Sequence, residues 1–111
     1  REIAFEQAKL ELKQTKNQVK LEMANARNEY QFALENYENK ERNLELAERI
    51  ENKNSIKFFE GIATSFELSE AQQQLFQAQQ DYLQAMLEVI NTKAELENLL
   101  DTTKYPENKK N

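Results

Sequence analysis

A seven-residue repeat in the C-terminal half of the chain constrains the fold more than any other feature. Apolar residues recur along this half in two sets, the second displaced from the first by three positions. The first set is Leu68, Leu75, Tyr82, Val89 and Leu96, and the second is Ala71, Ala78, Ala85, Thr92 and Leu99. This is an a/d seam, typical of a helix that packs along its length against another helix. The alanines of the second set favour a close approach of that neighbour.

The composition supports an all-α chain. The 111 residues include only one glycine and only one proline. These two residue types commonly mark the ends of strands and the turns of hairpins, so their scarcity disfavours a β-sheet fold. The length allows one domain at most. We therefore expect a long antiparallel helical hairpin or coiled coil with a broken second arm.

The first helix is predicted over residues 2–36. Its seam consists of residues spaced by seven, namely Phe5, Leu12, Val19, Ala26 and Ala33. Residues 36–43 contain three asparagines and no aliphatic residue. We predict a tight helical turn at residues 36–41, because folding back would cover the apolar stripe. Local propensity alone would also let the helix run straight through.

A second helix is predicted over residues 40–59, followed by a joint at residues 60–64. Gly61 can adopt the left-handed conformation after a helix end, which would bring Ile62 back near Ile56 in a Schellman ending. Thr64 and Glu67 have the spacing of a capping box. So short a joint can kink a rod or reverse it, and the sequence leaves both open.

The third helix is predicted over residues 65–101, with a disordered tail at 102–111. A second apolar stripe, widened by Met86 and Leu87, consists of Phe76, Leu83 and Ile90. Between Ala71 and Leu87 there are seven glutamines and a single charged residue, Asp81. Such a face suits partial exclusion of water, or is simply a polar surface.

The predicted lengths imply association. Suppose that the chain turns at residues 36–41 and only kinks at Gly61. The second and third helices together are then longer than the first helix by roughly 20 residues, at a rise of 1.5 Å per residue. The residues left without a partner would be Val89, Ile90, Leu96, Leu99 and Leu100. We therefore expect self-association, or partner segments outside this chain.

Composition also excludes several classes of function. A net charge of −5 gives no electrostatic basis for binding nucleic acid. Without histidine or cysteine there is no zinc triad, imidazole base or thiolate, and the acidic residues look like ordinary surface groups. We expect no enzyme activity, no cofactor and no metal.

The joint and the repeat resemble the C-terminal part of the TolC-type outer-membrane efflux proteins. The family pattern is an aromatic residue, a glycine, a serine or threonine, then Leu-x-x-Ala-Gln and heptad positions with a tyrosine. Here the pattern consists of Phe58, Gly61, Thr64, Leu68, Ala71, Gln72, Leu75, Ala78, Tyr82 and Ala85. The resemblance covers roughly residues 20–100.

The resemblance implies one half of a periplasmic helical barrel, in the periplasmic portion of an outer-membrane channel. Such proteins are trimers that form an export conduit and dock a periplasmic adaptor and an inner-membrane pump. The resemblance places the docking tip near residues 36–41 and a kink at the joint, whose residues are Gly61, Ile62, Thr64 and Glu67. The candidates for tip or gate contacts are Tyr37, Glu38, Lys40, Glu41 and Arg42.

The chain departs from the family pattern in several respects. The membrane strands, the first helical repeat and a signal sequence are absent from these 111 residues, and Leu100 is followed by Asp101 rather than glycine. We therefore expect an excised fragment of such a subunit. The alternative is a soluble coiled-coil scaffold or interaction protein with no transport role, which the heptad repeat favours equally.

Overall fold

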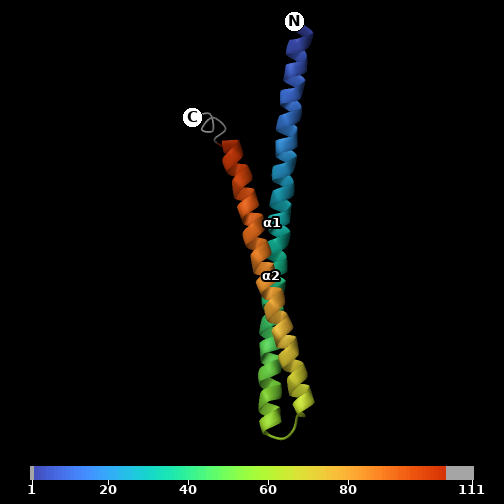
Figure 1. The fold of residues 1–111 in the computed structure, drawn as a ribbon, viewed down its shortest axis with the longest axis vertical. Helices are drawn as coiled ribbons and strands as arrows, with labels where there is room; N and C mark the ends of the chain where they lie inside the picture. The colour runs from blue at the N-terminus through green and yellow to red at the C-terminus, as the bar shows by residue number, and fades with distance from the viewer. Residues whose placement is uncertain (1, 105–111) are drawn as a thin grey trace. The chain divides into compact units, whose positions relative to one another are not determined.

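The computed structural model describes residues 2–104, and it is all-α (Figure 1). Helix α1 spans Glu2–Phe59 and helix α2 spans Ser65–Lys104. A short turn at residues 60–64 joins them into an antiparallel hairpin of two long helices. The predicted all-α hairpin is therefore confirmed, although its turn is not where we expected it.

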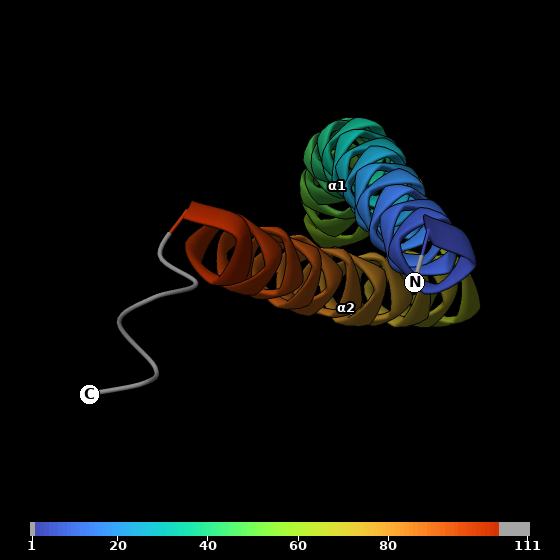
Figure 2. The ribbon, with the colours of Figure 1, turned by 90° about the horizontal axis from the view of Figure 1, so that it is seen from above.

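The predicted turn at residues 36–41 is wrong. α1 is one helix of 58 residues, so the predicted helices 2–36 and 40–59 are a single element. Figures 1 and 2 show its ribbon continuing without a break through this region. The asparagines are weak helix formers, but each costs no more than about 0.7 kcal/mol relative to alanine. Because the stretch contains neither glycine nor proline, nothing in it forces the helix to stop.

The end of α1 is a Schellman motif at Gly61. The Ile62 amide donates to the Lys57 carbonyl oxygen at 2.8 Å, and the Gly61 amide donates to the Phe58 carbonyl oxygen at 3.0 Å. Gly61 has a φ of 79°, which is the left-handed conformation that the motif requires. Ile62 and Ile56 are 70% and 52% exposed, so the expected contact between them buries neither side chain.

The start of α2 is capped as the sequence predicts. The Glu67 amide donates to Thr64 Oγ1 at 3.1 Å, and the Leu68 amide donates to the Thr64 carbonyl oxygen at 3.1 Å. Thr64 is therefore the N-cap residue. The reciprocal bond from the Glu67 side chain to the Thr64 amide stays a prediction.

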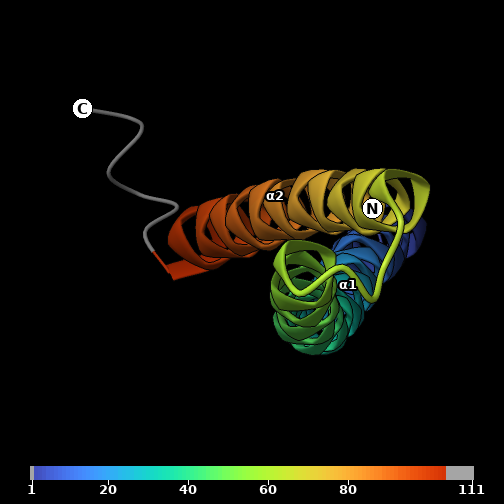
Figure 3. The ribbon, with the colours of Figure 1, turned by 90° about the horizontal axis from the view of Figure 1, so that it is seen from below.

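The joint reverses the chain, and the expected kink is wrong. Figure 3, seen from the turn end, shows the connection crossing from the end of α1 to the start of α2. Residues 32–91 form one of two compact units, and the two helices run antiparallel within it. The seam of α2 therefore packs against α1 of the same chain.

Three of the four buried residues of this unit lie at predicted heptad positions, and the fourth, Ala63, lies in the turn. The buried ones are Ala33, Ala63, Ala71 and Ala85. Half-buried seam residues are Tyr37, Leu44, Ala47, Leu68, Leu75, Ala78, Tyr82 and Val89. The seven-residue period thus predicted the buried face of α2. For the seam predicted over residues 2–36 it was right at Val19, Ala26 and Ala33 and wrong at Phe5 and Leu12, which are 63% and 59% exposed.

The other unit consists of residues 1–31 and 92–111, of which the structure describes 2–31 and 92–104. Its buried side chains are Ala26 and Thr92. Half-buried residues are Val19, Met23, Tyr30, Leu96 and Leu99, and every residue from Glu2 to Gln18 is exposed.

The expectation that the end of α2 lacks a partner is wrong for three of its five residues. Val89, Leu96 and Leu99 are half-buried, whereas Ile90 and Leu100 stay exposed. The reversal is the cause, because it brings α2 back along α1. Residues 102–104 of the predicted tail are helical, and residues 105–111 lie outside the described residues.

We predict that Gly61→Ala lowers the free energy of unfolding by about 1–2 kcal/mol, because an L side chain is strained at positive φ. An added Cβ would meet no atom within 4 Å, so the cost comes from the backbone alone. Urea unfolding followed by circular dichroism measures the loss. Gly61→Asn should cost less, since asparagine tolerates this conformation. Equal stability of wild type and Gly61→Ala would contradict the Schellman ending.

We predict that Thr64→Ala destabilises the hairpin by about 1 kcal/mol through loss of the N-cap oxygen. Thr64→Ser keeps that oxygen and should stay near wild type in the same urea titration. A serine variant as unstable as the alanine variant would show that the threonine methyl, rather than the cap, is responsible.

Candidate functional site

Four exposed apolar residues gather at the hairpin turn, and we name them the turn cluster: Phe58, Phe59, Ile62 and Phe66. They are 38%, 84%, 70% and 74% exposed, respectively. Phe58 and Phe59 end α1, Ile62 lies in the turn, and Phe66 belongs to the first turn of α2. The turn thus exposes three aromatic rings and an isoleucine within nine residues of the chain.

The backbone bonds of the turn hold this cluster in place. The Schellman motif and the Thr64 cap fix the backbone that carries these side chains. The rings of Phe58 and Phe59 are 6.0 Å apart and meet edge to face at 68°. The cluster is thus carried on a turn whose backbone is fixed by hydrogen bonds.

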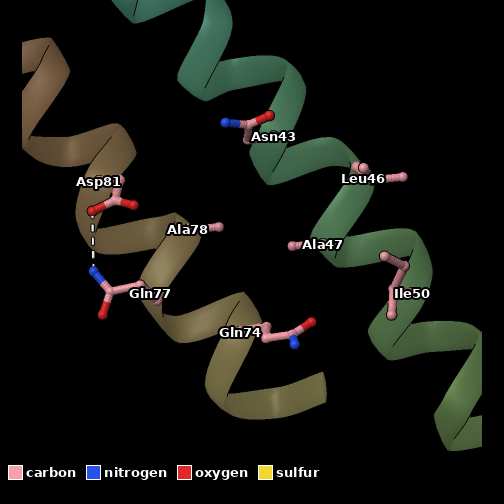
Figure 4. A pocket seen from close by; sticks show the side chains of 8 residues that line it. All are labelled: Asn43, Leu46, Ala47, Ile50, Gln74, Gln77, Ala78 and Asp81. Atoms are coloured by element: carbon pink, nitrogen blue, oxygen red, sulfur yellow. Dashed lines mark hydrogen bonds between the residues drawn. The ribbon is translucent and has the colours of Figure 1, made fainter. Parts of the chain in front are cut away.

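A groove between the two helices lies nearby in the same unit (Figure 4). It is lined by Asn43, Leu46, Ala47, Ile50, Gln74, Gln77, Ala78 and Asp81. Figure 4 shows Ala47 and Ala78 pointing toward one another across the groove, while Gln77 donates to Asp81 Oδ1 at 3.0 Å. The groove is open, and its eight lining residues include no nucleophile–base pair.

A tyrosine pair links the two helices. The hydroxyl groups of Tyr37 and Tyr82 are 2.9 Å apart, and their ring centroids are 5.3 Å apart at an interplanar angle of 31°. The hydrogen bond with Tyr37 raises the pKa of Tyr82 above its ordinary value. Partial burial, the electrostatic interaction with Tyr37 and the negative charge of Glu41 raise this pKa further.

The predicted tip residues lie within α1 rather than at a turn. Tyr37 and Lys40 are half-buried, and Glu38, Glu41 and Arg42 are exposed. Of these five residues, Tyr37 bonds to Tyr82, and the charge of Glu41 acts on the pKa of Tyr82. Because the chain does not reverse here, the group has no geometric basis as a docking tip.

The predicted joint residues form the observed turn, but sequence reasoning missed the neighbouring surface. As expected, Gly61 has the left-handed conformation after the end of α1, and Thr64 caps the start of α2. The exposure of Phe59 and Phe66 was not predicted. The available signal was three phenylalanines within five residues of the only glycine.

Residues 2–104 contain no group of three or more acidic residues placed to hold a metal ion. No helix in the described part of the chain has the length and apolarity needed to cross a membrane. No family model, curated protein or solved structure matches this chain.

We predict that Tyr82 ionises above its ordinary pKa of about 10 and that Tyr37→Phe brings this pKa back toward 10. A raised pKa means that the fold favours the neutral phenol. The stabilisation is complete below pH 10 and is lost as the pH rises through the folded-state pKa. Carbon NMR of ring-labelled tyrosine, titrated with pH, measures this pKa. A Tyr82 resonance that titrates identically in wild type and Tyr37→Phe would contradict the coupling.

Proposed function

We propose that this chain is the periplasmic helical hairpin of a TolC-type outer-membrane efflux subunit, and that its turn docks a periplasmic adaptor. The chain would contribute part of the wall of an export conduit and perform no catalysis. The observation that carries the proposal is the turn cluster, an apolar group exposed at the end of a hairpin. Burying such side chains contributes about 1.5–3 kcal/mol each when burial is complete.

The residues behind the family resemblance support this proposal by their position. Phe58, Gly61 and Thr64 build the turn, and Leu68 and Ala71 begin the seam behind it. The motif therefore supplies the backbone bonds of the turn and one residue of the turn cluster, Phe58.

The proposal moves the docking end from residues 36–42 to residues 58–66. An adaptor that meets a helical hairpin end-on contacts its turn, and the described chain reverses at residues 60–64. Lys57, Glu60 and Glu67 lie around the turn cluster and would form a polar rim, as in other protein interfaces.

The test is binding of the 111-residue chain to a purified periplasmic adaptor from the same organism, measured by biolayer interferometry. We predict that Phe59→Ser weakens binding at least about tenfold, because an exposed aromatic anchor is removed. Phe32→Ser is the matched control, since Phe32 is 75% exposed on α1 away from the turn. Equal weakening by both variants, or no binding by the wild type, would contradict adaptor docking at the turn.

The full reading frame separates this proposal from the scaffold alternative. A secretory signal and alternating strand segments in the full-length protein would support the channel subunit. A frame that encodes only further heptads would support a coiled-coil scaffold, in which the turn cluster serves another partner.

A further inference from the structure

The groove of Figure 4 is one part of a longer groove between the two helices. A second hollow adjoins it, and Ile50 and Gln74 line both. The other residues that line the second hollow are Asn54, Glu67, Glu70 and Ala71. We name the two hollows together the long groove, which runs over residues 43–54 of α1 and 67–81 of α2. At 1.5 Å per residue these stretches are about 17 and 21 Å long, which is enough for about three turns of another helix.

The floor of the long groove consists of small residues, and its edge on α1 is aliphatic. Ala47, Ala71 and Ala78 lie between the helices and are buried or half-buried. Leu46 and Ile50, about one helical turn apart on α1, are 54% and 38% exposed. Small residues let another backbone approach closely, and the two aliphatic side chains offer it apolar surface. A groove of this kind suits the apolar stripe of an amphipathic helix.

The two sides of the long groove differ in charge. α2 contributes three carboxylates to the lining, those of Glu67, Glu70 and Asp81, and neither helix contributes a lysine or an arginine to it. On α1, Arg49 and Lys53 follow the two aliphatic residues of the edge by three positions. They therefore lie about 60° further around the helix, on the side away from α2. A helix in the groove thus has acidic residues along one flank and basic residues beyond the other.

These charges select the occupant. Two copies of the long groove would bring like carboxylates together, which opposes their pairing. A helix with a row of lysine or arginine toward α2 and a row of acidic residues toward Arg49 and Lys53 meets opposite charges on both flanks. In coiled coils, charges at such flanking positions set the choice of partner and its orientation.

We propose that the long groove binds an amphipathic helix of a partner protein, with an alanine and leucine stripe on the floor and a row of lysine or arginine against the carboxylates of α2. The hairpin and the bound helix then form a three-helix bundle. None of the four turn-cluster residues lines the long groove, so this site is separate from the turn and does not depend on the function proposed above.

The test is fluorescence anisotropy of a labelled synthetic peptide titrated with the full 111-residue chain. The probe is a helical peptide about three heptads long, with leucine and alanine at its a and d positions, lysine along one flank and glutamate along the other. We predict that this lysine peptide binds. The same peptide with glutamate on both flanks should bind at least about tenfold more weakly, because the carboxylates of α2 repel it.

Variants of the chain locate the contact. Leu46→Ser should weaken binding of the lysine peptide at least about tenfold, because it removes apolar surface at the groove edge. Leu83→Ser is the matched control, since Leu83 is 51% exposed on α2 and does not line the groove.

A charge reversal keeps the test valid if Leu46→Ser perturbs the fold. Glu70→Lys should weaken binding of the lysine peptide roughly three- to tenfold and strengthen binding of the all-glutamate peptide. Glu45→Lys makes the same change of charge at an exposed residue of α1 outside the groove, and should leave both affinities nearly unchanged.

Failure of the lysine peptide to bind, or equal effects of Leu46→Ser and Leu83→Ser, would overturn the inference. Sedimentation equilibrium that shows the chain pairing with itself, with the pairing lost in Leu46→Ser, would also overturn it, because the occupant would then be a second copy. Phe59→Ser, which tests the turn cluster, should leave peptide binding unchanged, so failure of one proposal is distinguishable from failure of the other.

Discussion

The structure depends on a contact between two helices lined by small residues. The residues that the hairpin buries most completely are alanines and one threonine, and no large side chain among those described is fully buried. Because the distance between helix axes depends on the side chains at the contact, alanines bring the two backbones close. Such a seam excludes water without holding much apolar volume. Many of the large apolar residues therefore remain on the outer surfaces, where both proposed interaction sites lie.

The seam also contains polar groups that position the helices relative to each other. Tyr37 and Tyr82 satisfy one another's hydroxyl groups across the contact, at a distance of 2.9 Å. Sliding one helix past the other would separate the pair and leave two partly buried hydroxyl groups without this bond. A polar pair at a seam position thus favours one register over its neighbours, as polar residues do in coiled coils.

Much of the local structure was predictable, because it rests on interactions close in sequence. The heptad positions of α2 predicted its buried face, and the Gly61 and Thr64 signals predicted a helix end and a helix start at the observed residues. The turn expected at residues 36–41 failed because asparagine only weakens a helix, whereas the seam through Tyr37 and Leu44 continues to be covered by α2. The turn cluster was missed because exposure depends on which residues the reversal leaves uncovered.

By itself, the sequence determined that this chain is helical, where its clearest helix end and start lie, and which face of α2 is apolar. These properties follow from backbone propensity, capping bonds and a seven-residue period, all of which act within a few turns of helix. Only the tertiary structure decided that the joint at residues 60–64 is a reversal and that α1 is unbroken. The capping chemistry of Gly61 and Thr64 is compatible with either a kink or a reversal. The direction is set by packing between residues far apart in the chain, such as Tyr37 and Tyr82.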